Sequence, residues 1–371
     1  MSKKILLATR PLVPPWDEAS KNFAYFLGKE VQNHSLTILT TKEKLADLPQ
    51  SVHEEAIFEN GHLDFHAKLR LFSYLRKVRK SFDITHYLFT PTKQNTRFIR
   101  WFTRPKGKTI QTVATLREDL YSERELRSLL FADKIIVYTD LTKQKLERLG
   151  FDNVTRIYPG IDLERYSPKE KDQALLTQLG FTPEHFIVLY PGEYTRLGAT
   201  DMLTETFLRY FEENPDTDLR FVFACRVKND ADREKKEQVR ARFAAAGLLD
   251  YVAFSDTISD MPGLYNTTDV VIFPVENLKG KFDVPLIIIE AYACGKPVIL
   301  SDLPQFLEFT NRDICVTIPK DSGEKLIESL AYLKQNEAER IRLGENARRF
   351  VKDHFDLKNT AKQYEEIYSS L

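Results

Sequence analysis

A single carboxylate, Glu290, interrupts an apolar stretch whose residues are typical of a short buried helix. The surrounding sequence is FDVPLIIIEAYACGKPV, residues 282–298. Asp283 can cap such a helix, Pro285 suits its first turn, and the Gly and Pro of CGKP end it. We therefore expect a helix over residues 284–293.

The N-terminus of this helix and the side chain of Glu290 offer different chemistry. Unpaired amides at the N-terminus, from Leu286 and Ile287, favour an anion such as a phosphate. Glu290 lies about a turn and a half further along, where its carboxylate could accept hydrogen bonds from two vicinal hydroxyl groups, each contributing about 1.5–3 kcal/mol. A phosphate followed by a ribose describes a nucleoside diphosphate. The alternative is a glutamate on the helix surface that points into water.

The elements that must position these groups are short β-branched runs separated by longer amphipathic segments. Such continuous apolar strands between helices indicate parallel sheets covered on both faces, an α/β architecture. The expected strands are residues 3–9, 35–40, 83–89, 108–115, 134–139, 186–192, 219–225, 251–254, 269–274, 296–301 and 314–319. Ligands of such sheets bind beyond the carboxyl ends of the strands.

The strands fall into two groups divided by a segment rich in Pro, Gly and charge, residues 159–172. Such a composition is typical of a linker. We therefore expect two doubly wound domains of similar size with a cleft between them. Residues 359–371 form an amphipathic stretch that we expect to be helical.

Composition narrows the functional classes. Lys plus Arg and Asp plus Glu each number 54, which argues against a uniformly basic nucleic-acid binder. The three cysteines lack metal-ligand spacing, and no signal peptide precedes the first strand, so we expect a reducing, cytosolic compartment. Apolar runs reach only about seven residues, against roughly twenty needed to cross a bilayer.

Several common catalytic motifs are missing from the sequence. No G-x-G-x-x-G opens a βα unit, which argues against a nicotinamide dehydrogenase, and no P-loop is present, which argues against kinases and ATPases. The seven histidines lack zinc spacing, so no metal site is expected. Asp230 and Asp232 open a charged segment, where acids favour a helix N-terminus.

The segment around Glu290 resembles the donor-site motif of retaining GT-B glycosyltransferases, in particular glycosyltransferase family 4, where E-G/P-F-G-L leads into L-E-A-M-A-x-G-x-P-V. Other landmarks extend the resemblance along most of the chain. They are ADKIIVYTDLTKQKLERLGF with YPGIDLERYSP, MPGLYNTTDVVIFP, and LGENARRFVKDHFDLKNTAKQYEEIYSSL.

The resemblance implies a GT-B fold, with two Rossmann-like domains facing a cleft. Residues 1–165 would form the acceptor-binding domain, residues 166–350 the nucleotide-sugar domain, and residues 351–371 a helix crossing back to the first. It also implies a metal-independent, retaining transfer of a hexose from a UDP- or GDP-linked sugar to a lipid-linked or glycan acceptor. No cofactor is expected, and the location would be the cytoplasm, including the inner face of the plasma membrane. The alternative is a degenerate scaffold that binds a glycan or partner without transfer.

The catalytic positions depart from the family pattern. An acid that touches the transferred sugar in the family corresponds to Phe282, with Asp283 one residue out of register. The histidine that often follows the fourth strand corresponds to Ala114. Asp283 is therefore the expected sugar contact. His86 matches the first His of the family's H-x-H pattern and is expected to border the cleft; the alternative is a structural histidine near a strand end.

The phosphate-binding positions also depart. The family's Arg and Lys in G-R-x…K-G correspond to Glu193 and to Arg196 or Leu197. Pro285 replaces a Gly and removes one phosphate-facing amide. We therefore expect cations near the start of the helix to neutralise the diphosphate. The alternative is that the lysines among them are simply exposed on the surface. Besides Glu290, the expected donor-binding residues are Gly192, Arg196, Lys279, Lys281, Leu286 and Ile287.

On the acceptor side, Ala19 and Ser20 replace the Gly-Gly of the family's first loop. Arg117 and Glu118 follow the strand at residues 108–115, so either could contact a substrate.

Residues 68–108 are unusually basic and aromatic, with twelve Lys or Arg, one acid and eight aromatic residues. Apolar stripes alternate with cations at helical spacing. We expect docking onto anionic lipid, as a basic helix of the first domain does in some family members. The alternatives are a solvated helix face or a phosphorylated or sulfated glycan as ligand; no nucleic acid is expected. The expected patch comprises Arg76, Lys77, Arg79, Lys80, Arg97, Arg100, Trp101 and Arg104.

Overall fold

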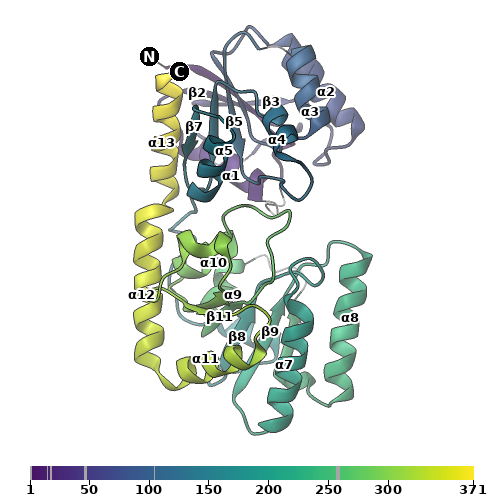
Figure 1. Ribbon diagram of the computed structural model, residues 1–371, viewed down its shortest axis with the longest axis vertical. Helices are drawn as coiled ribbons and strands as arrows, with labels where there is room; N and C mark the ends of the chain where they lie inside the picture. Colours follow the sequence, from purple (N-terminus) through teal and green to yellow (C-terminus); the bar gives the residue numbers. More distant parts are fainter. Residues whose placement is uncertain (1, 15, 17–18, 46–47, 104, 256–259) are drawn as a thin grey trace. The chain divides into compact units, whose positions relative to one another are not determined.

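The computed structural model describes residues 2–14, 16, 19–45, 48–103, 105–255 and 260–371. The chain divides into two compact units (Figure 1). The first unit comprises Met1–Asp162, Gly280–Val284 and Phe355–Leu371, and the second comprises Leu163–Lys279 and Pro285–His354. Each unit is therefore assembled from segments that are distant in the sequence.

A parallel seven-stranded sheet forms the centre of the first unit, with the order β3-β2-β1-β4-β5-β6-β7. Ile5 of β1 pairs with Leu36 of β2 on one side and Ile84 of β4 on the other. The strands are β1 Lys4–Ala8, β2 Ser35–Thr40, β3 Val52–Ala56, β4 Ile84–Tyr87, β5 Lys108–Val113, β6 Lys134–Val137 and β7 Val154–Arg156.

Helices cover this sheet, and their ends follow local capping rules. The Asp64 side chain accepts a hydrogen bond from the amide of Ala67, and Thr92 and Thr139 cap the next helices in the same way. The helices are α1 Ala19–Glu30, α2 Phe65–Lys77, α3 Lys93–Phe98, the π-helix η1 Ile99–Thr103, α4 Glu123–Leu129, α5 Asp140–Arg148 and α13 Leu357–Ser370.

The last helix of the chain, α13, packs against α1 in the first unit (Figure 1). The buried carboxylate of Glu365 accepts hydrogen bonds at 2.6 Å from the amides of Gln32 and Asn33, just after α1. These bonds satisfy backbone donors that the end of α1 would otherwise leave to solvent.

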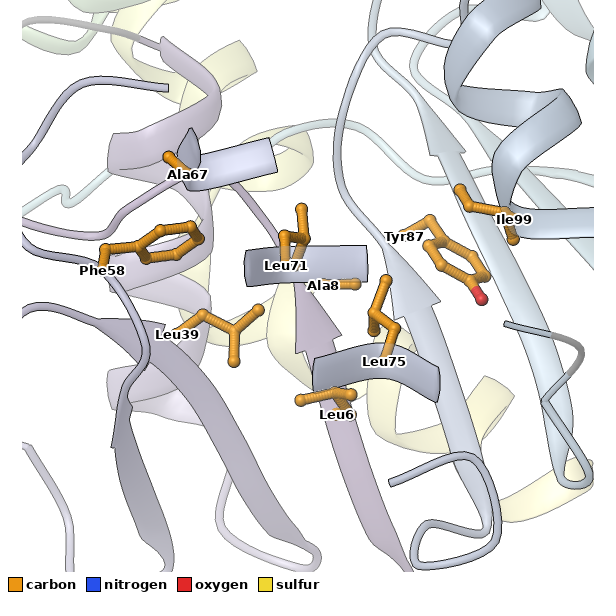
Figure 2. Packing of buried hydrophobic residues seen from close by; sticks show 9 residues of the cluster. All are labelled: Leu6, Ala8, Leu39, Phe58, Ala67, Leu71, Leu75, Tyr87 and Ile99. Atoms are coloured by element: carbon orange, nitrogen blue, oxygen red, sulfur yellow. The ribbon is translucent and has the colours of Figure 1, made fainter. Parts of the chain in front are cut away.

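Part of the first unit's core lies between its sheet and the pair α2–η1 (Figure 2). Leu71 and Leu75 of α2 and Ile99 of η1 pack against Leu6 of β1 and Tyr87 of β4. The apolar stripe of α2 thus faces the core, which leaves its charged face to solvent.

A parallel six-stranded sheet forms the second unit, with the order β10-β9-β8-β11-β12-β13. The strands are β8 Phe186–Tyr190, β9 Leu219–Ala224, β10 Val252–Ser255, β11 Val270–Phe273, β12 Val298–Ser301 and β13 Val316–Ile318. The helices are α6 Gln173–Leu179, α7 Ala199–Glu213, α8 Asp230–Ala245, η2 Leu249–Tyr251, α9 Met261–Thr267, α10 Leu286–Ala293, η3 Pro304–Phe309, α11 Gly323–Gln335 and α12 Glu337–His354.

Helices α10 and α12 approach each other closely through glycine. A Cβ atom on Gly344 of α12 would lie 2.0 Å from the carbonyl oxygen of Gly295. Gly295 itself ends α10 with φ of 68°, a left-handed conformation that favours glycine. The CGKP turn therefore ends α10 as expected and also makes room for α12.

All eleven expected strands are present and both sheets are parallel, so the predicted fold class is confirmed. The sequence missed two strands, β3 and β7, which both lie at an edge of the first sheet. Their sequences, VHEEA and VTR, are largely polar and short. An edge strand needs no apolar run because only one of its sides is paired and its faces are less covered.

Candidate functional site

The carboxyl edge of the second sheet provides the site's framework. Strands β8 and β11 are neighbours, although β9 and β10 lie between them in the sequence. The connections that follow β8 and β11 therefore run in opposite directions along the sheet. Ligands of such sheets bind at the point where these connections diverge. The loop after β8 carries Gly192, Glu193 and Arg196, and the segment after β11 leads into α10.

The N-terminus of α10 suits an anion. Pro285, which has no polar side chain, occupies the N-cap position, and its carbonyl accepts from the amide of Ile288 at 2.9 Å. The N–H groups of Leu286 and Ile287 are the first two of the helix and have no acceptor within it. The predicted anion site depends on these amides and on the helix dipole, and it stays a prediction.

The expectation that Asp283 caps α10 is wrong, because the helix begins only at Leu286 and Asp283 belongs to the first unit. Its carboxylate accepts hydrogen bonds from the Thr142 hydroxyl at 2.8 Å and the Leu116 amide at 3.3 Å. Its own amide donates to Ala114 at 2.9 Å. The segment 280–284 is thereby tied to the loop after β5 and to the first turn of α5.

Glu290 is partly buried among tyrosines. Tyr265 of α9 donates a hydrogen bond from its hydroxyl group to Glu290 Oε2 at 3.1 Å, and the ring of Tyr166 lies 6.5 Å from that of Tyr265. Burial raises the pKa of Glu290 to about 7, while these phenols and the charge of Arg165 act in the opposite direction. A carboxylate has about four acceptor positions, so the bond from Tyr265 leaves acceptor positions for ligand hydroxyls.

Arg196 does not stand alone as a cation. Its Nε and one terminal nitrogen each donate to the carboxylate of Glu193 at 2.6 Å. Lys228, which follows β9, also forms an ion pair with Glu193, and Glu193 is 5% exposed. Two cations therefore share one buried acid, and the group keeps one net positive charge. Glu193, which occupies the position of the family's arginine, thus holds one cation from the loop after β8 and one from the loop after β9.

Gly192 has a packing reason to be glycine, because a Cβ atom there would lie 2.0 Å from the ring of Tyr190. Lys279 is exposed, and Lys281 is partly buried within the segment that joins the first unit. Asp232 is buried near the start of α8, where it accepts from the Thr195 hydroxyl at 2.7 Å. The interpretation of Asp232 as a helix-terminus acid is thus confirmed.

His86 is fully buried, so the expectation that it borders a cleft is wrong. Its Nδ1 bonds to the Tyr368 hydroxyl and its Nε2 to the Thr112 hydroxyl, both at 2.8 Å. Burial lowers the pKa of His86 to about 3. A neutral imidazole enclosed by α13 and the sheet is suited to holding that helix in place. The strand pattern could not show that the last helix covers it.

The expected acceptor-side residues lie in the first unit. Ala19 opens α1, and the partly exposed Ser20 follows it. Arg117 forms two hydrogen bonds of 2.8 Å with Asp119, while Glu118 forms an ion pair with Lys145. The loop that carries them is the loop to which Asp283 is tied.

The basic patch lies on α2, α3 and η1. Phe72, Phe98 and Phe102 form a stack with ring centroids 4.6 and 4.7 Å apart, and Arg97 lies over the Trp101 ring at 5.4 Å. A hollow of about 380 Å³ opens beside Trp101 and is lined in part by Arg97 and Arg100. The cations expected on α2 and after it, Arg76, Lys77, Arg79 and Lys80, are exposed or partly exposed; Arg104 lies outside the described residues.

Large apolar side chains are exposed on the helices that carry this patch. Trp101 and Phe102 of η1 are 65% and 48% exposed, and Phe65 and Leu69 of α2 are 70% and 44% exposed. Phe65 and Leu69 are four residues apart and so share one side of α2. Over the ranges that the structure describes, no helix is long and apolar enough to span a bilayer.

Three residues of the site were missed from the sequence: Lys228, Tyr166 and Tyr265. Lys228 follows the strand at residues 219–225, a position that the carboxyl-edge rule could have singled out. Tyr166 lies in the linker and Tyr265 in a short helix, so only the fold brings them to Glu290. In the described part of the chain, no group of three or more His, Cys, Asp or Glu side chains is arranged to hold a metal ion.

Comparisons with known proteins show what this chain is similar to. Residues 185–336 match the profile of the family described as Glycosyl transferases group 1. A D-inositol 3-phosphate glycosyltransferase of Streptomyces bingchenggensis is 29% identical over 178 residues, which cover 46% of this chain and 38% of that protein. The alignment thus spans less than two thirds of that relative.

Two further proteins are similar over more of the chain. The lipopolysaccharide core biosynthesis mannosyltransferase LpcC of Rhizobium leguminosarum bv. viciae is 25% identical over 279 residues, 74% of each chain. The crystal structure of Anabaena Alr3699/HepE in complex with UDP and glucose has a TM-score of 0.76 at 16% identity and covers 100% of both chains. Residues 185–336 of the second unit are thus similar to the Glycosyl transferases group 1 family, and the two parallel-sheet units have the GT-B fold.

Proposed function

We propose that this protein is a retaining, metal-independent glycosyltransferase that moves a hexose from a UDP- or GDP-linked sugar to a lipid-linked or glycan acceptor. The observation that carries the proposal is the combination of an anion-binding end of α10 with Glu290 deeper in the same helix. Both lie within the region that matches the family profile.

The donor nucleotide is assigned to the second unit. The amides of Leu286 and Ile287 bind the diphosphate from one side, and the Glu193-held cations Arg196 and Lys228 neutralise it from the loops after β8 and β9. Lys279 and Lys281, which precede α10 in the sequence, are the further cations expected to bind the diphosphate. Glu290 accepts hydrogen bonds from the ribose hydroxyls, each contributing about 1.5–3 kcal/mol.

Transfer on one face of the sugar needs little help from a protein base. The departing phosphate can take the proton of the acceptor hydroxyl as the new bond forms, so the enclosed His86 is not required. Asp283 is assigned a positioning role, since its carboxylate is engaged by Thr142 and Leu116. It fixes Phe282, whose ring lies 5.8 Å from that of Tyr138.

The proposed substrates follow the chemistry named for similar proteins. Relatives are named as D-inositol 3-phosphate glycosyltransferases and as a lipopolysaccharide core mannosyltransferase, and similar structures contain UDP with glucose or UDP-glucose. These names support a hexose donor and an acceptor that is a glycan or is linked to lipid.

The acceptor would be reached at an anionic membrane surface. Exposed Phe65, Leu69, Trp101 and Phe102 lie on two helices in contact, α2 and η1, among the cations of the basic patch. Each cation near an anionic bilayer contributes about 1 kcal/mol, and apolar side chains can enter the interface. This supports a peripheral location on the inner face of the plasma membrane.

A second candidate is a scaffold that binds a glycan or partner but does not transfer sugar. The observation that favours it is Phe282 at the position where the family has an acid that touches the sugar. Either candidate would be able to bind a nucleotide, but only the enzyme would cleave the sugar from its donor.

A panel of UDP- and GDP-linked sugars separates these candidates. The protein is incubated with each donor, with and without EDTA, and products are read by mass spectrometry. The transferase hydrolyses at least one donor slowly and transfers its sugar faster to an added acceptor, at equal rates with and without EDTA. NMR of the transfer product should show that the anomeric configuration is retained. Glu290→Ala should lose most of this turnover. A folded protein that turns over none of the donors would support the scaffold.

A further inference from the structure

We propose that Asp232 is a positioning residue for the donor's diphosphate: its buried carboxylate holds together the two loops that carry the cations Arg196 and Lys228. The inference rests on the proposed function, in which these two cations neutralise the diphosphate. It goes further because it assigns a role in binding to an acid whose position at a helix terminus is otherwise sufficient to explain it.

The carboxylate of Asp232 bridges the loops after β8 and β9. Its Oδ1 accepts a hydrogen bond from the Thr195 hydroxyl at 2.7 Å, and its Oδ2 accepts one from the Lys228 amide at 3.2 Å. Thr195 directly precedes Arg196 in the first loop, and Lys228 lies in the second. Each carboxylate oxygen therefore holds the chain at or beside one of the two cations.

The bridge is buried and is itself anchored on a helix. Asp232 is only 4% exposed, and a buried carboxylate that lost its donors would not regain full contact with water, so these bonds are costly to break. The amide of Asp232 donates to the side chain of Asn229, the N-cap residue of α8, at 2.9 Å. The bridging carboxylate thus belongs to the first turn of a 16-residue helix.

The two buried acids of this region, Glu193 and Asp232, act on different parts of the cationic residues. Glu193 pairs with the side chains of Arg196 and Lys228, whereas Asp232 holds the Lys228 amide and the residue before Arg196. The carbonyl oxygen of Glu193 also accepts from the Thr200 hydroxyl at 3.2 Å, which ties the same loop to the first turn of α7. Both side chains and backbone of the cation pair are therefore held in place before a ligand binds.

The effect of removing Asp232 should have the opposite sign to that expected from its charge. A carboxylate near a diphosphate repels it, so by charge alone the removal of Asp232 would strengthen anion binding. If the carboxylate instead holds the cations in place, its removal weakens anion binding, because the loops must then be ordered when the ligand binds. The direction of the change separates a bridge from a nearby negative charge.

The test is the affinity of Asp232→Ala for UDP and GDP, measured by isothermal titration, and for uridine and guanosine, measured by NMR titration. For each base that the wild type binds, the diphosphate should bind about tenfold more weakly, and nucleoside binding should change by less than about twofold. Asp232→Asn should restore diphosphate binding to within about threefold of the wild type, because the amide can accept from Lys228 and donate to Thr195. Asp232→Asn removes the same charge as Asp232→Ala, so this rescue would identify the bridge as the cause.

Two further variants complete the test. Thr195→Val removes one of the two loop contacts and keeps the carboxylate, so diphosphate binding should weaken about threefold; this variant covers the case that Asp232→Ala does not fold. Asp230→Ala is the matched control, because Asp230 is an acid in the same first turn of α8 and its side chain is 99% exposed. It should bind UDP and GDP as the wild type does.

The inference is overturned if a folded Asp232→Ala binds the diphosphate as tightly as the wild type or more tightly, or if it weakens diphosphate and nucleoside binding by the same factor. It is equally overturned if Asp232→Asn binds no better than Asp232→Ala, if Asp230→Ala has the same effect, or if Thr195→Val keeps the wild-type affinity. Absence of binding by the wild type to both UDP and GDP is a different result, because it removes the proposed function as well.

Discussion

Arg196 donates two hydrogen bonds of 2.6 Å to the buried carboxylate of Glu193. Glu193 occupies the position of the family's arginine, and through this bidentate contact it holds the guanidinium group of Arg196 in place. Lys228 shares the same acid, so the loops after β8 and β9 are joined at the edge of the sheet. The apparent loss of a phosphate-binding residue is thus accompanied by a rearranged set of cations.

Replacing Arg196 or Lys228 by Ala should weaken binding of UDP and GDP by about 1.5–3 kcal/mol each, because each removes a charge-assisted contact to the diphosphate. Binding of the corresponding nucleoside, which has no phosphate, should change little. Arg242→Ala is the matched control, since Arg242 forms a bidentate pair with Glu205 on the surface of the same unit. Equal weakening of nucleoside and nucleotide binding would contradict the assignment.

His86→Ala should lower the free energy of unfolding of the first unit. The change leaves the hydroxyls of Tyr368 and Thr112 without the imidazole, at a cost of about 1–3 kcal/mol for each buried group. Urea unfolding measures the effect, with the exposed His53→Ala as control. A folded variant that loses turnover but keeps wild-type stability would restore a catalytic role for His86.

The same residue predicts a dependence of stability on pH. The pKa of His86 is about 3 in the folded protein, against 6.5 as its ordinary value, so the unfolded chain binds a proton first as pH falls. The stabilisation is present above about pH 6.5 and is lost progressively toward pH 3. The stability difference between wild type and His86→Ala should therefore narrow over that range, and a constant difference would argue against a buried neutral imidazole.

Gly344→Ala should lower the melting temperature, although alanine favours a helix over glycine by about 1 kcal/mol. The added Cβ would meet the carbonyl oxygen of Gly295 at 2.0 Å and force α12 away from α10. Gly28→Ala in α1 is the control, because its Cβ would meet Leu36 at 3.7 Å, an ordinary contact. Calorimetric melting should show opposite signs for the two variants; stabilisation by both would show that α12 can shift freely.

Vesicle flotation tests the basic patch. The protein should float with vesicles containing anionic lipid, less so at high salt, and Arg97→Ala or Arg100→Ala should each cost about 1 kcal/mol. Trp101→Ala should also weaken flotation, since its ring is 65% exposed. Lys325→Ala, an exposed cation of the second unit, serves as control. Equal flotation of all variants, or none for the wild type at any salt, would remove the membrane proposal.

The strands and helices that carry the site were predictable because their apolar periodicity is strong. Glu290 was identified as a ligand candidate because an acid inside an apolar helix is conspicuous. The same local reasoning failed for Asp283 and His86, whose partners, Thr142 and Tyr368, lie far away in the sequence. The capping role of Asp283 was chemically reasonable, but tertiary hydrogen bonds replaced it.

The edge strand β3 and the tyrosines around Glu290 show a second limit. Val52–Ala56 contains two acids and has no apolar run, so only pairing with β2 makes it a strand. Tyr166 and Tyr265 have no spacing relative to Glu290 that a sequence pattern could detect. Arg348 holds the backbone of Tyr166 next to α10, and Tyr265 comes from α9, so only the fold brings these two residues to the helix of Glu290.

Isothermal titration of UDP and GDP into the wild type and Glu290→Ala is the most direct test of the donor site. We expect at least one nucleoside diphosphate to bind with micromolar to low-millimolar affinity, and Glu290→Ala to weaken it by about 1.5–3 kcal/mol. Absence of binding by the wild type, or unchanged affinity in a folded Glu290→Ala variant, would contradict the account.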